Sequence, residues 1–397
     1  MRRETIPTHP TVRSTPFDPP PELNEYRTNE PIRRMRYPGG HVGWLVTSHA
    51  LARSLLSDPR FSARSEFKRP PVARPGVEPF YGAPALPGWL VDMDAPRHTR
   101  IRRQLAGAFT ARRMKSLREP IDRIVDGLLD EMQRHGPPVD LVEAFTLPVP
   151  SQMICELLGV PYAERAEFQR HSETLFSLTA SAEEASAAMD RLYTLVGALA
   201  TTGGDRDGLL ANLVNGGVLD VEEITGVGVL LLTAGHESTA SSLALSTFAL
   251  LSHPDQLAAL KAVPEMITNA VEELLRYLTV FHMGVPRSPL KDVEFAGQCL
   301  RAGESITVSL PAVNRDPVWF PGMPDELDIN RPTSGHLAFG FGIHQCLGQN
   351  LVRMEMRAAL PALFQRFPTL ALAVPADEVP LSSDMSVYGV QELLVTW

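Results

Sequence analysis

Cys346 stands among glycines in a segment that is expected to end where a helix begins. Residues 337–348 read Leu-Ala-Phe-Gly-Phe-Gly-Ile-His-Gln-Cys-Leu-Gly. Glycines permit positive φ and let the backbone pass close to a large flat group. The N–H groups at a helix start lower the pKa of a thiol and stabilise the thiolate. A hydrogen-bonded thiolate suits an iron centre that activates oxygen; a nucleophilic or a buried structural cysteine is the alternative.

A long helix is predicted in the middle of the chain. Asp220 followed by Glu223 forms a capping box, and the helix is expected to run from Val221 to about Leu251. Residues 227–233 are apolar on nearly every side, which is typical of a helix that passes through the middle of a protein.

Polar residues interrupt this apolar helix. The segment Ala234-Gly235-His236-Glu237-Ser238-Thr239 places a glycine and a carboxylate where each costs free energy. The small Ala234-Gly235 pair is expected to let a bulky group approach the backbone, and to open the helical hydrogen bonding there. Glu237 and Ser238 are then placed to handle protons, because local rules are broken where function requires it. A helix kink with a solvated polar patch is the alternative.

The elements that position these residues follow from periodicity and from Pro and Gly. Residues 1–40 are predicted as an extended arm, and 62–91 as a long loop rich in Pro and Gly. Strands are predicted at 41–47, within 283–310, and as a pair within 381–397. Helices are predicted at 48–57, 97–110, 118–135, 140–158, 162–178, 183–200, 205–215, 221–251 and 347–366. The fold class is therefore mainly α with small β-sheets (α+β), and 1–397 is expected to be one domain.

Composition excludes several classes of protein. The net charge of −9 gives no reason to expect nucleic acid or an anionic membrane as a partner. Apolar residues at 44% and charged residues at 21% are typical of a globular protein. The three cysteines are far apart, which disfavours a disulfide framework and a zinc site and favours a reducing cytoplasm. No apolar stretch approaches ~20 residues, so no membrane span is expected.

Several motifs occur together in one order. Asp94 to Arg103 is a basic stretch in which His98 and Arg102 share a helix face; Glu273 and Arg276 follow the central helix; the Cys346 segment comes last. In this order, and with Phe339-Gly340-x-Gly342-x-His344-x-Cys346-x-Gly348, the chain resembles the cytochrome P450 superfamily. The C-terminal stretch and residues 147–161 look most like soluble actinobacterial members.

The resemblance implies a triangular helical body whose long central helix lies over haem b. Cys346 is then the iron ligand. The implied haem-binding residues are His98, Arg102, Arg287, His344, Phe339 and Gly340. The implied oxygen-binding and proton-handling residues are Ala234, Gly235, Glu237, Ser238 and Thr239. Ser238 departs from the family pattern, which usually has Thr there, and this leaves open whether Thr239 shares its task. The Glu273–Arg276 pair is implied to be structural, with Arg331 as a candidate third partner.

The implied function is a haem-thiolate monooxygenase that inserts one oxygen atom of dioxygen into a bulky apolar secondary metabolite, such as a polyketide, macrolide or terpenoid. Phenol coupling, desaturation or aromatic nitration at the same centre is the alternative, and a non-catalytic haem sensor is a third reading. Electrons are expected from a ferredoxin and its NAD(P)H-dependent reductase, and a monomer is expected. Substrate choice is attributed to 62–91, 170–190, 280–285 and 386–390, with Phe281, Met283 and Val387 as pocket residues. The basic residues Arg102, Arg103, Arg112, Arg113 and Lys115 are expected to contribute to ferredoxin docking, or else to form a solvated helix face.

Overall fold

The computed structural model describes residues 6–202 and 208–397. Its helices of eight or more residues are α1 (Glu22–Asn29), α2 (His49–Ser57), α3 (Arg97–Leu105), α5 (Arg118–His135), α6 (Pro148–Leu158), α7 (Arg165–Phe176), α8 (Ala182–Thr202), α9 (Leu209–Gly216), α10 (Val221–Ser252), α11 (Pro254–Ala262), α12 (Ile267–Leu278) and α14 (Gln349–Arg366). The shorter α4 (Ala111–Ser116) and α13 (Leu310–Val313) complete the α-helices of the described ranges.

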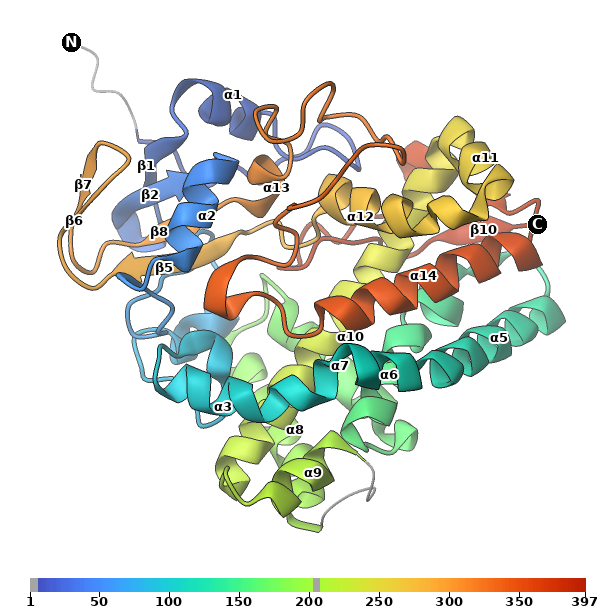
Figure 1. Cartoon of the computed structure of the whole chain (residues 1–397), viewed down its shortest axis with the longest axis horizontal. Coiled ribbons are helices and arrows are strands. Elements are labelled where there is room, and N and C mark those ends of the chain that lie inside the picture. The colour runs from blue at the N-terminus through green and yellow to red at the C-terminus, as the bar shows by residue number, and fades with distance from the viewer. Residues whose placement is uncertain (1–5, 203–207) are drawn as a thin grey trace.

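The strands form small sheets at the edges of the helical body (Figure 1). One sheet has the order β1-β2-β8-β5-β3, in which β2 and β8 are parallel and the other pairs are antiparallel. A second sheet has the order β4-β10-β9, and β6 and β7 form a hairpin. The strands are β1 (Ile32–Arg36), β2 (Val42–Val46), β3 (Phe61–Ser62), β4 (Val139–Asp140), β5 (Val285–Pro289), β6 (Val293–Phe295), β7 (Gln298–Leu300), β8 (Ile306–Val308), β9 (Ala371–Leu372) and β10 (Leu394–Thr396).

Helix α10 crosses the middle of the molecule, and other helices surround it (Figure 1). The predicted capping box is present: Asp220 accepts a hydrogen bond from the backbone N–H of Glu223 at 2.8 Å, and the Glu223 carboxylate accepts one from the N–H of Asp220. Most of the helix is buried, as its apolar sequence predicts. Because the surrounding helices hold α10 in place, the polar residues 234–239 have fixed positions.

The 62–91 segment is mainly irregular, as predicted, with short 3₁₀ turns at Pro75–Phe80 and Leu90–Asp92. Its end packs directly on α10. A side chain at Gly226 would lie 1.8 Å from the carbonyl oxygen of Pro87, and one at Gly88 would lie 2.1 Å from the carbonyl oxygen of Glu223. These glycines allow backbone-to-backbone contact, which fixes the end of the loop against the central helix.

The structure corrects several predicted boundaries. The 1–40 arm is not wholly extended, since it contains the helix α1. Its strand β1 pairs with β2, a contact that sequence periodicity does not show. The predicted helix 140–158 begins as β4 and a π-helical turn before α6. In 381–397 the expected strand pair is present only as an isolated antiparallel bridge between Leu381 and Val390, and β10 pairs with the distant β4 and β9. Of the predicted helix 205–215, residues 205–207 lie outside the described residues and the rest corresponds to α9.

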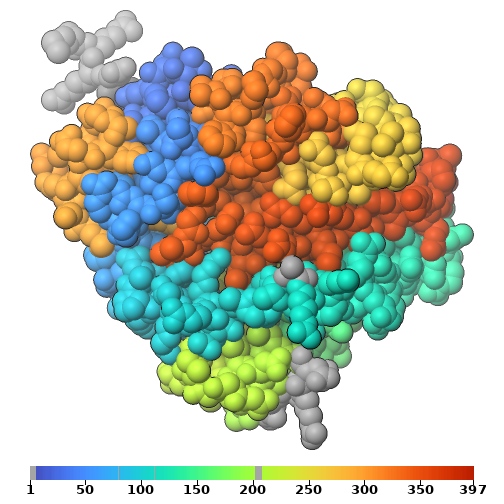
Figure 2. Space-filling model, viewed as in Figure 1, coloured from blue at the N-terminus to red at the C-terminus, as the bar shows by residue number. Residues whose placement is uncertain are grey.

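The cysteine loop and α14 lie against α3 and α4 at the surface. In Figure 2 the orange-red residues of about 340–366 meet the cyan residues of about 97–120 along one face. None of the helices within the described ranges is long and apolar enough to cross a membrane.

Candidate active site

The segment that holds Cys346 is folded as its glycines predict. Gly340 and Gly342 have φ of 68° and 75°, and a side chain at Gly342 would lie 2.4 Å from the carbonyl oxygen of Leu56. The backbone N–H of Cys346 donates to the carbonyl of Phe339 at 2.9 Å, which closes the loop just before α14 begins. The thiol is therefore held in one place by the backbone.

Burial and the nearby positive groups shift the pKa of the Cys346 thiol in opposite directions. Burial raises the pKa of Cys346 above its ordinary value and outweighs the backbone N–H of Gly348 and the charges of Arg102 and Arg353, which lower it. The helix start thus supplies the N–H donors that a thiolate needs, as the sequence predicts. A metal cation at the sulfur would favour the thiolate further.

Two histidines with unpaired ring nitrogens and a buried arginine lie at this loop. His98 is 1% exposed, and neither of its ring nitrogens has a hydrogen-bond partner within the described structure. Its ring centroid lies 4.2 Å from that of His344, whose Nε2 also lacks a partner there. Arg287 is buried, and its Nη1 donates to its neighbour, the Pro286 carbonyl, at 2.8 Å.

This arrangement is costly for the protein alone. Burial, and then the charge of Arg102, lowers the pKa of His98 to about 4. Burial, and then the charge of Arg287, lowers the pKa of His344 to about 2. Unpaired buried donors are rare because each loses its hydrogen bonds to water. Two carboxylates of a bound group would supply the missing acceptors, so these residues fit haem propionates.

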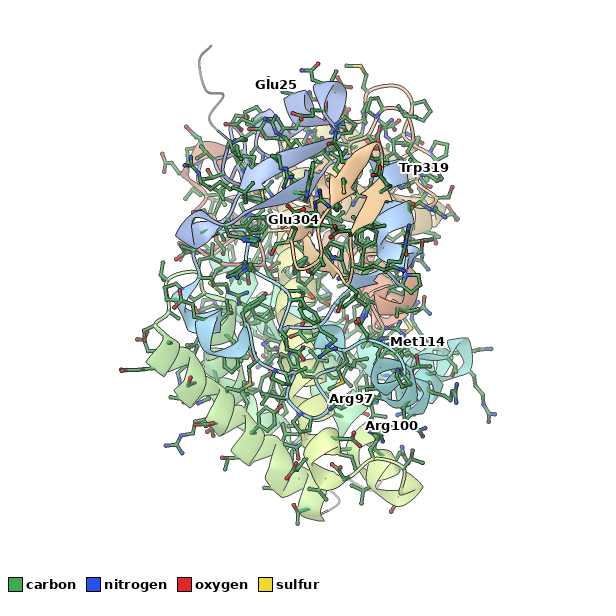
Figure 3. The ribbon with its side chains drawn as sticks, turned by 90° about the vertical axis from the view of Figure 1, so that its left-hand side faces the viewer. Glu25, Arg97, Arg100, Met114, Glu304 and Trp319 are labelled. Carbon is green, nitrogen blue, oxygen red and sulfur yellow. The ribbon has the colours of Figure 1, made fainter. Side chains whose placement is uncertain are left out.

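Helix α3 carries buried and exposed basic residues on different faces. Arg97 and Arg100, which flank His98 in the sequence and are labelled in Figure 3, are exposed. Arg100 forms an ion pair with Glu223 at the start of α10. The helix therefore buries one face toward the Cys346 loop and presents charge to solvent on the other.

Arg102 also contacts the backbone of the cysteine segment. Its Nη2 donates to the backbone carbonyl of Gln345, the residue before Cys346, at 2.5 Å. This contact links α3 to the loop, so Arg102 acts on the cysteine segment through the backbone as well as through its charge.

Lys68 was missed by the sequence analysis: it is buried, pairs with Asp92, and adds positive charge near His344. Its position in the irregular loop gave no signal.

The polar segment of α10 shows which residues face the site. Ala234 is exposed although the helix around it is largely buried. Ser238 Oγ donates to the Ala234 carbonyl at 3.0 Å. Glu237 Oε1 lies 3.6 Å from His236 Nε2. The helix continues through this segment, so the predicted opening of its hydrogen bonding is not present.

Thr239, and the direction in which a side chain on Gly235 would point, face the protein instead. A side chain at Gly235 would lie 2.8 Å from Cδ1 of Ile154 on α6, so this glycine lets α6 approach. Thr239 is 0% exposed, and its hydroxyl reaches the Gly235 carbonyl at 3.5 Å. Of the small pair, Ala234 alone is exposed, and of the two hydroxyls, Ser238 is the more accessible.

The Glu273–Arg276 pair is fully buried. Arg276 donates to the Glu273 carboxylate at 2.7 and 2.8 Å, and Arg331 Nε donates to the same carboxylate at 3.3 Å. The prediction that Arg331 is the third partner is confirmed. Arg276 also donates to the backbone carbonyls of Asn314 and Pro324. Asn314 in turn accepts from the N–H of Leu337, so the pair is linked to the start of the cysteine segment.

A second ionic group, missed from the sequence, supports α14. Burial raises the pKa of Glu272, but hydrogen bonds from His336 and Arg353 outweigh it and hold the pKa at about 2. The Arg353 guanidinium also lies 4.5 Å from the centre of the Phe339 ring. Phe339 is thereby fixed against α14, although no motif in the sequence marks Glu272.

Comparison with known proteins agrees with this geometry. The family model described as cytochrome P450 matches residues 264–387. Cytochrome P450-SU2 of Streptomyces griseolus is 44% identical over 96% of this chain and 94% of its own length. The chain belongs to the cytochrome P450 family.

Other cytochrome P450 proteins match along nearly the whole chain. Pentalenic acid synthase of Streptomyces avermitilis is 44% identical over 98% of this chain and 96% of its own length. A crystal structure of a P450 in complex with filipin I has a TM-score of 0.91 and 40% identity, and covers 99% of both chains. The mycinamicin VIII hydroxylase MycCI of Micromonospora griseorubida has a TM-score of 0.91 and 34% identity, covering 99% of this chain and 100% of its own. The fold and the recognition made from sequence are confirmed, and this P450 is a monooxygenase with a haem-thiolate iron centre.

Proposed function

We propose that the chain, as one haem domain, binds haem b through Cys346 and inserts oxygen from dioxygen into a bulky apolar secondary metabolite that carries oxygen substituents. The observation that carries the site assignment is the facing pair of buried histidines, His98 and His344, whose free nitrogens match the carboxylates of the cofactor. Arg287 supplies a buried cation beside them. Phe339 and Gly340 belong to the loop that the cofactor faces.

The bound haem supplies oxygen activation, and the chain supplies position and protons. Ser238 uses its hydrogen for the Ala234 carbonyl, so its oxygen lone pairs are free to accept a hydrogen bond from water or substrate. Glu237 lies on the adjacent position of α10 and can hold a proton on its carboxylate. The exposed Ala234 leaves room for the substrate and dioxygen beside the helix.

The substrate class is inferred from relatives. Similar proteins include a pentalenic acid synthase, a P450 in complex with filipin I and a mycinamicin VIII hydroxylase. These are bulky, mainly apolar molecules with oxygen-bearing groups. The test is to titrate the purified ferric holoprotein with filipin I, mycinamicin VIII and vitamin D3 while recording the haem Soret band. A shift to the high-spin form with at least one compound is expected, and no shift with any would contradict the substrate class.

A ferredoxin and its NAD(P)H-dependent reductase are proposed to supply the electrons. Arg103, Arg112 and Lys115 are exposed on α3 and α4, and none has an ion-pair partner within the described ranges. Figure 2 shows that this part of the chain adjoins the segment around Cys346. A positive surface there would attract an acidic ferredoxin.

Charge reversal tests this docking surface. Arg112→Glu combined with Lys115→Glu is expected to slow reduction by ferredoxin, and more strongly at low ionic strength, because screening weakens exposed charges. Arg134→Glu, at the distant end of α5, is the matched control. Equal rates in all three proteins would remove the proposed surface.

A further inference from the structure

A cleft of about 570 Å³ lies where the N-terminal arm crosses the body of the protein. Its apolar side includes Val72, Leu178 and Met283. These residues come from three of the segments to which substrate choice is attributed, 62–91, 170–190 and 280–285. The arm contributes Thr8, His9 and Thr11 to the same cleft.

The arm is held in a fixed position beside the cleft. The backbone N–H of Arg36 donates to the Pro7 carbonyl at 2.8 Å, and Thr8 pairs with Arg36 in an isolated parallel bridge. The arm therefore extends the sheet edge at β1, and His9 is presented from an ordered backbone.

His9 is a buried polar side chain whose ring has no side-chain partner within the described residues. It is 5% exposed, and neither ring nitrogen makes a well-formed hydrogen bond there. Burial lowers its pKa to about 4, against a smaller effect of the Pro10 backbone that raises it, so the imidazole is neutral at pH 7 and offers one donor and one acceptor. An unpaired imidazole costs free energy in the protein alone, and a ligand with a polar group removes that cost.

The surroundings of His9 define what the ligand must carry. Thr8, Thr11, Ser383 and the exposed Arg36 also line the cleft and add polar groups to it. Val72, Leu178 and Met283 add apolar surface. A molecule that suits this lining has an apolar skeleton that carries oxygen atoms.

We propose that His9 is a substrate-binding residue, and that the cleft holds an oxygen-bearing end of the substrate through a hydrogen bond between its hydroxyl or carbonyl group and the imidazole. This inference rests on the proposed function and extends it, because it places a selectivity determinant in the N-terminal arm. The reacting end of the substrate is then separate from the end that His9 recognises.

The experiment compares His9→Leu, which removes the hydrogen bond, with His9→Gln, which keeps a donor and an acceptor. The exposed His135→Leu is the control. Each holoprotein is titrated with filipin I and mycinamicin VIII, and with cholestane as a hydrocarbon probe. We expect His9→Leu to bind the oxygenated probe that shifts the wild-type Soret band about 3- to 10-fold more weakly, which is the effect of one net hydrogen bond. His9→Gln and His135→Leu stay close to wild type, and the binding of cholestane does not change.

A second readout separates this inference from the proposed function. The His9 imidazole resonance is identified in the NMR spectrum of the ferrous, carbon monoxide-bound holoprotein by its loss in His9→Gln, and each probe is then added. A shifted His9 resonance without a Soret change would support the cleft and contradict the substrate class. A Soret change that is equal in wild type and His9→Leu, or a loss that extends to cholestane, would overturn the role of His9. No change in either signal would overturn both.

Discussion

Ser238 donates its hydroxyl hydrogen to the carbonyl oxygen of Ala234 at 3.0 Å, one turn earlier on the central helix. Thr239, the next residue, is wholly buried and directs its hydroxyl toward the Gly235 carbonyl. Adjacent residues on a helix point in directions that differ by about 100°. The two hydroxyls are therefore not interchangeable, and Ser238 is the one on the side of the exposed Ala234.

Replacement of these two residues gives different outcomes. Ser238→Ala is expected to lower product formation by at least about 10²-fold, because a positioned proton-handling group contributes that much, while consumption of NAD(P)H continues. Ser238→Thr keeps the hydroxyl and retains turnover. Thr239→Val keeps the coupling of NAD(P)H to product. Product and NAD(P)H are measured in the same reaction, and uncoupling by Thr239→Val but not by Ser238→Ala would reverse the assignment.

Gly235 is expected to act through packing. Gly235→Val places a branched side chain against Ile154, 2.8 Å from the position that a Cβ would take, and overpacking of this kind costs about 1–3 kcal/mol. Ile154→Ala in the same chain opens the space and restores part of the loss. The free energies of unfolding of the two single variants and the double variant are compared in urea. Additive losses would show that the two residues do not meet.

The buried carboxylate of Glu273 is expected to be essential for stability. Glu273→Gln leaves Arg276 charged and without its counterion in a site with 0% exposure. The loss of one partner of such a pair costs about 3–5 kcal/mol. Thermal unfolding of the holoprotein measures it, with Asp122→Asn as the control, since Asp122 pairs with Arg118 at the surface. A Tm equal to that of the control would contradict the structural role of the pair.

His282 gives the protein a defined acid sensitivity. Burial lowers its pKa to about 3, and the unfolded chain takes up a proton near the ordinary value of 6.5. Between these values the unfolded state binds more protons, so stability falls as pH decreases from about 6.5. His282→Gln removes this contribution, so the unfolding free energy of the variant should fall less steeply between pH 6.5 and pH 4 than that of the wild type. The two slopes should differ by roughly 1.4 kcal/mol per pH unit at most, which is the effect of one proton. Parallel curves would contradict a neutral buried His282.

The sequence predicted the central helix, its capping box and the cysteine loop because each depends on local signals: Asp220 and Glu223 lie within one turn, and the glycines surround Cys346 directly. It did not predict that β10 pairs with β4, because that contact joins residues far apart in the chain. The contact of Arg102 with Gln345 and the group around Glu272 were missed for the same reason. Side-chain partners such as Gln345 or His336 are brought near only by the tertiary fold.

The assignment of Cys346 as the iron ligand is tested most directly by the absorption spectrum of the reduced, carbon monoxide-bound protein. Wild type, Cys155→Ser and Cys299→Ser are all expected to show the long-wavelength Soret band of thiolate-ligated haem. Cys346→His is expected to bind haem but to show the shorter-wavelength band of histidine ligation. A thiolate band that persists in Cys346→His, or that disappears in Cys155→Ser or Cys299→Ser, would contradict the site built around Cys346.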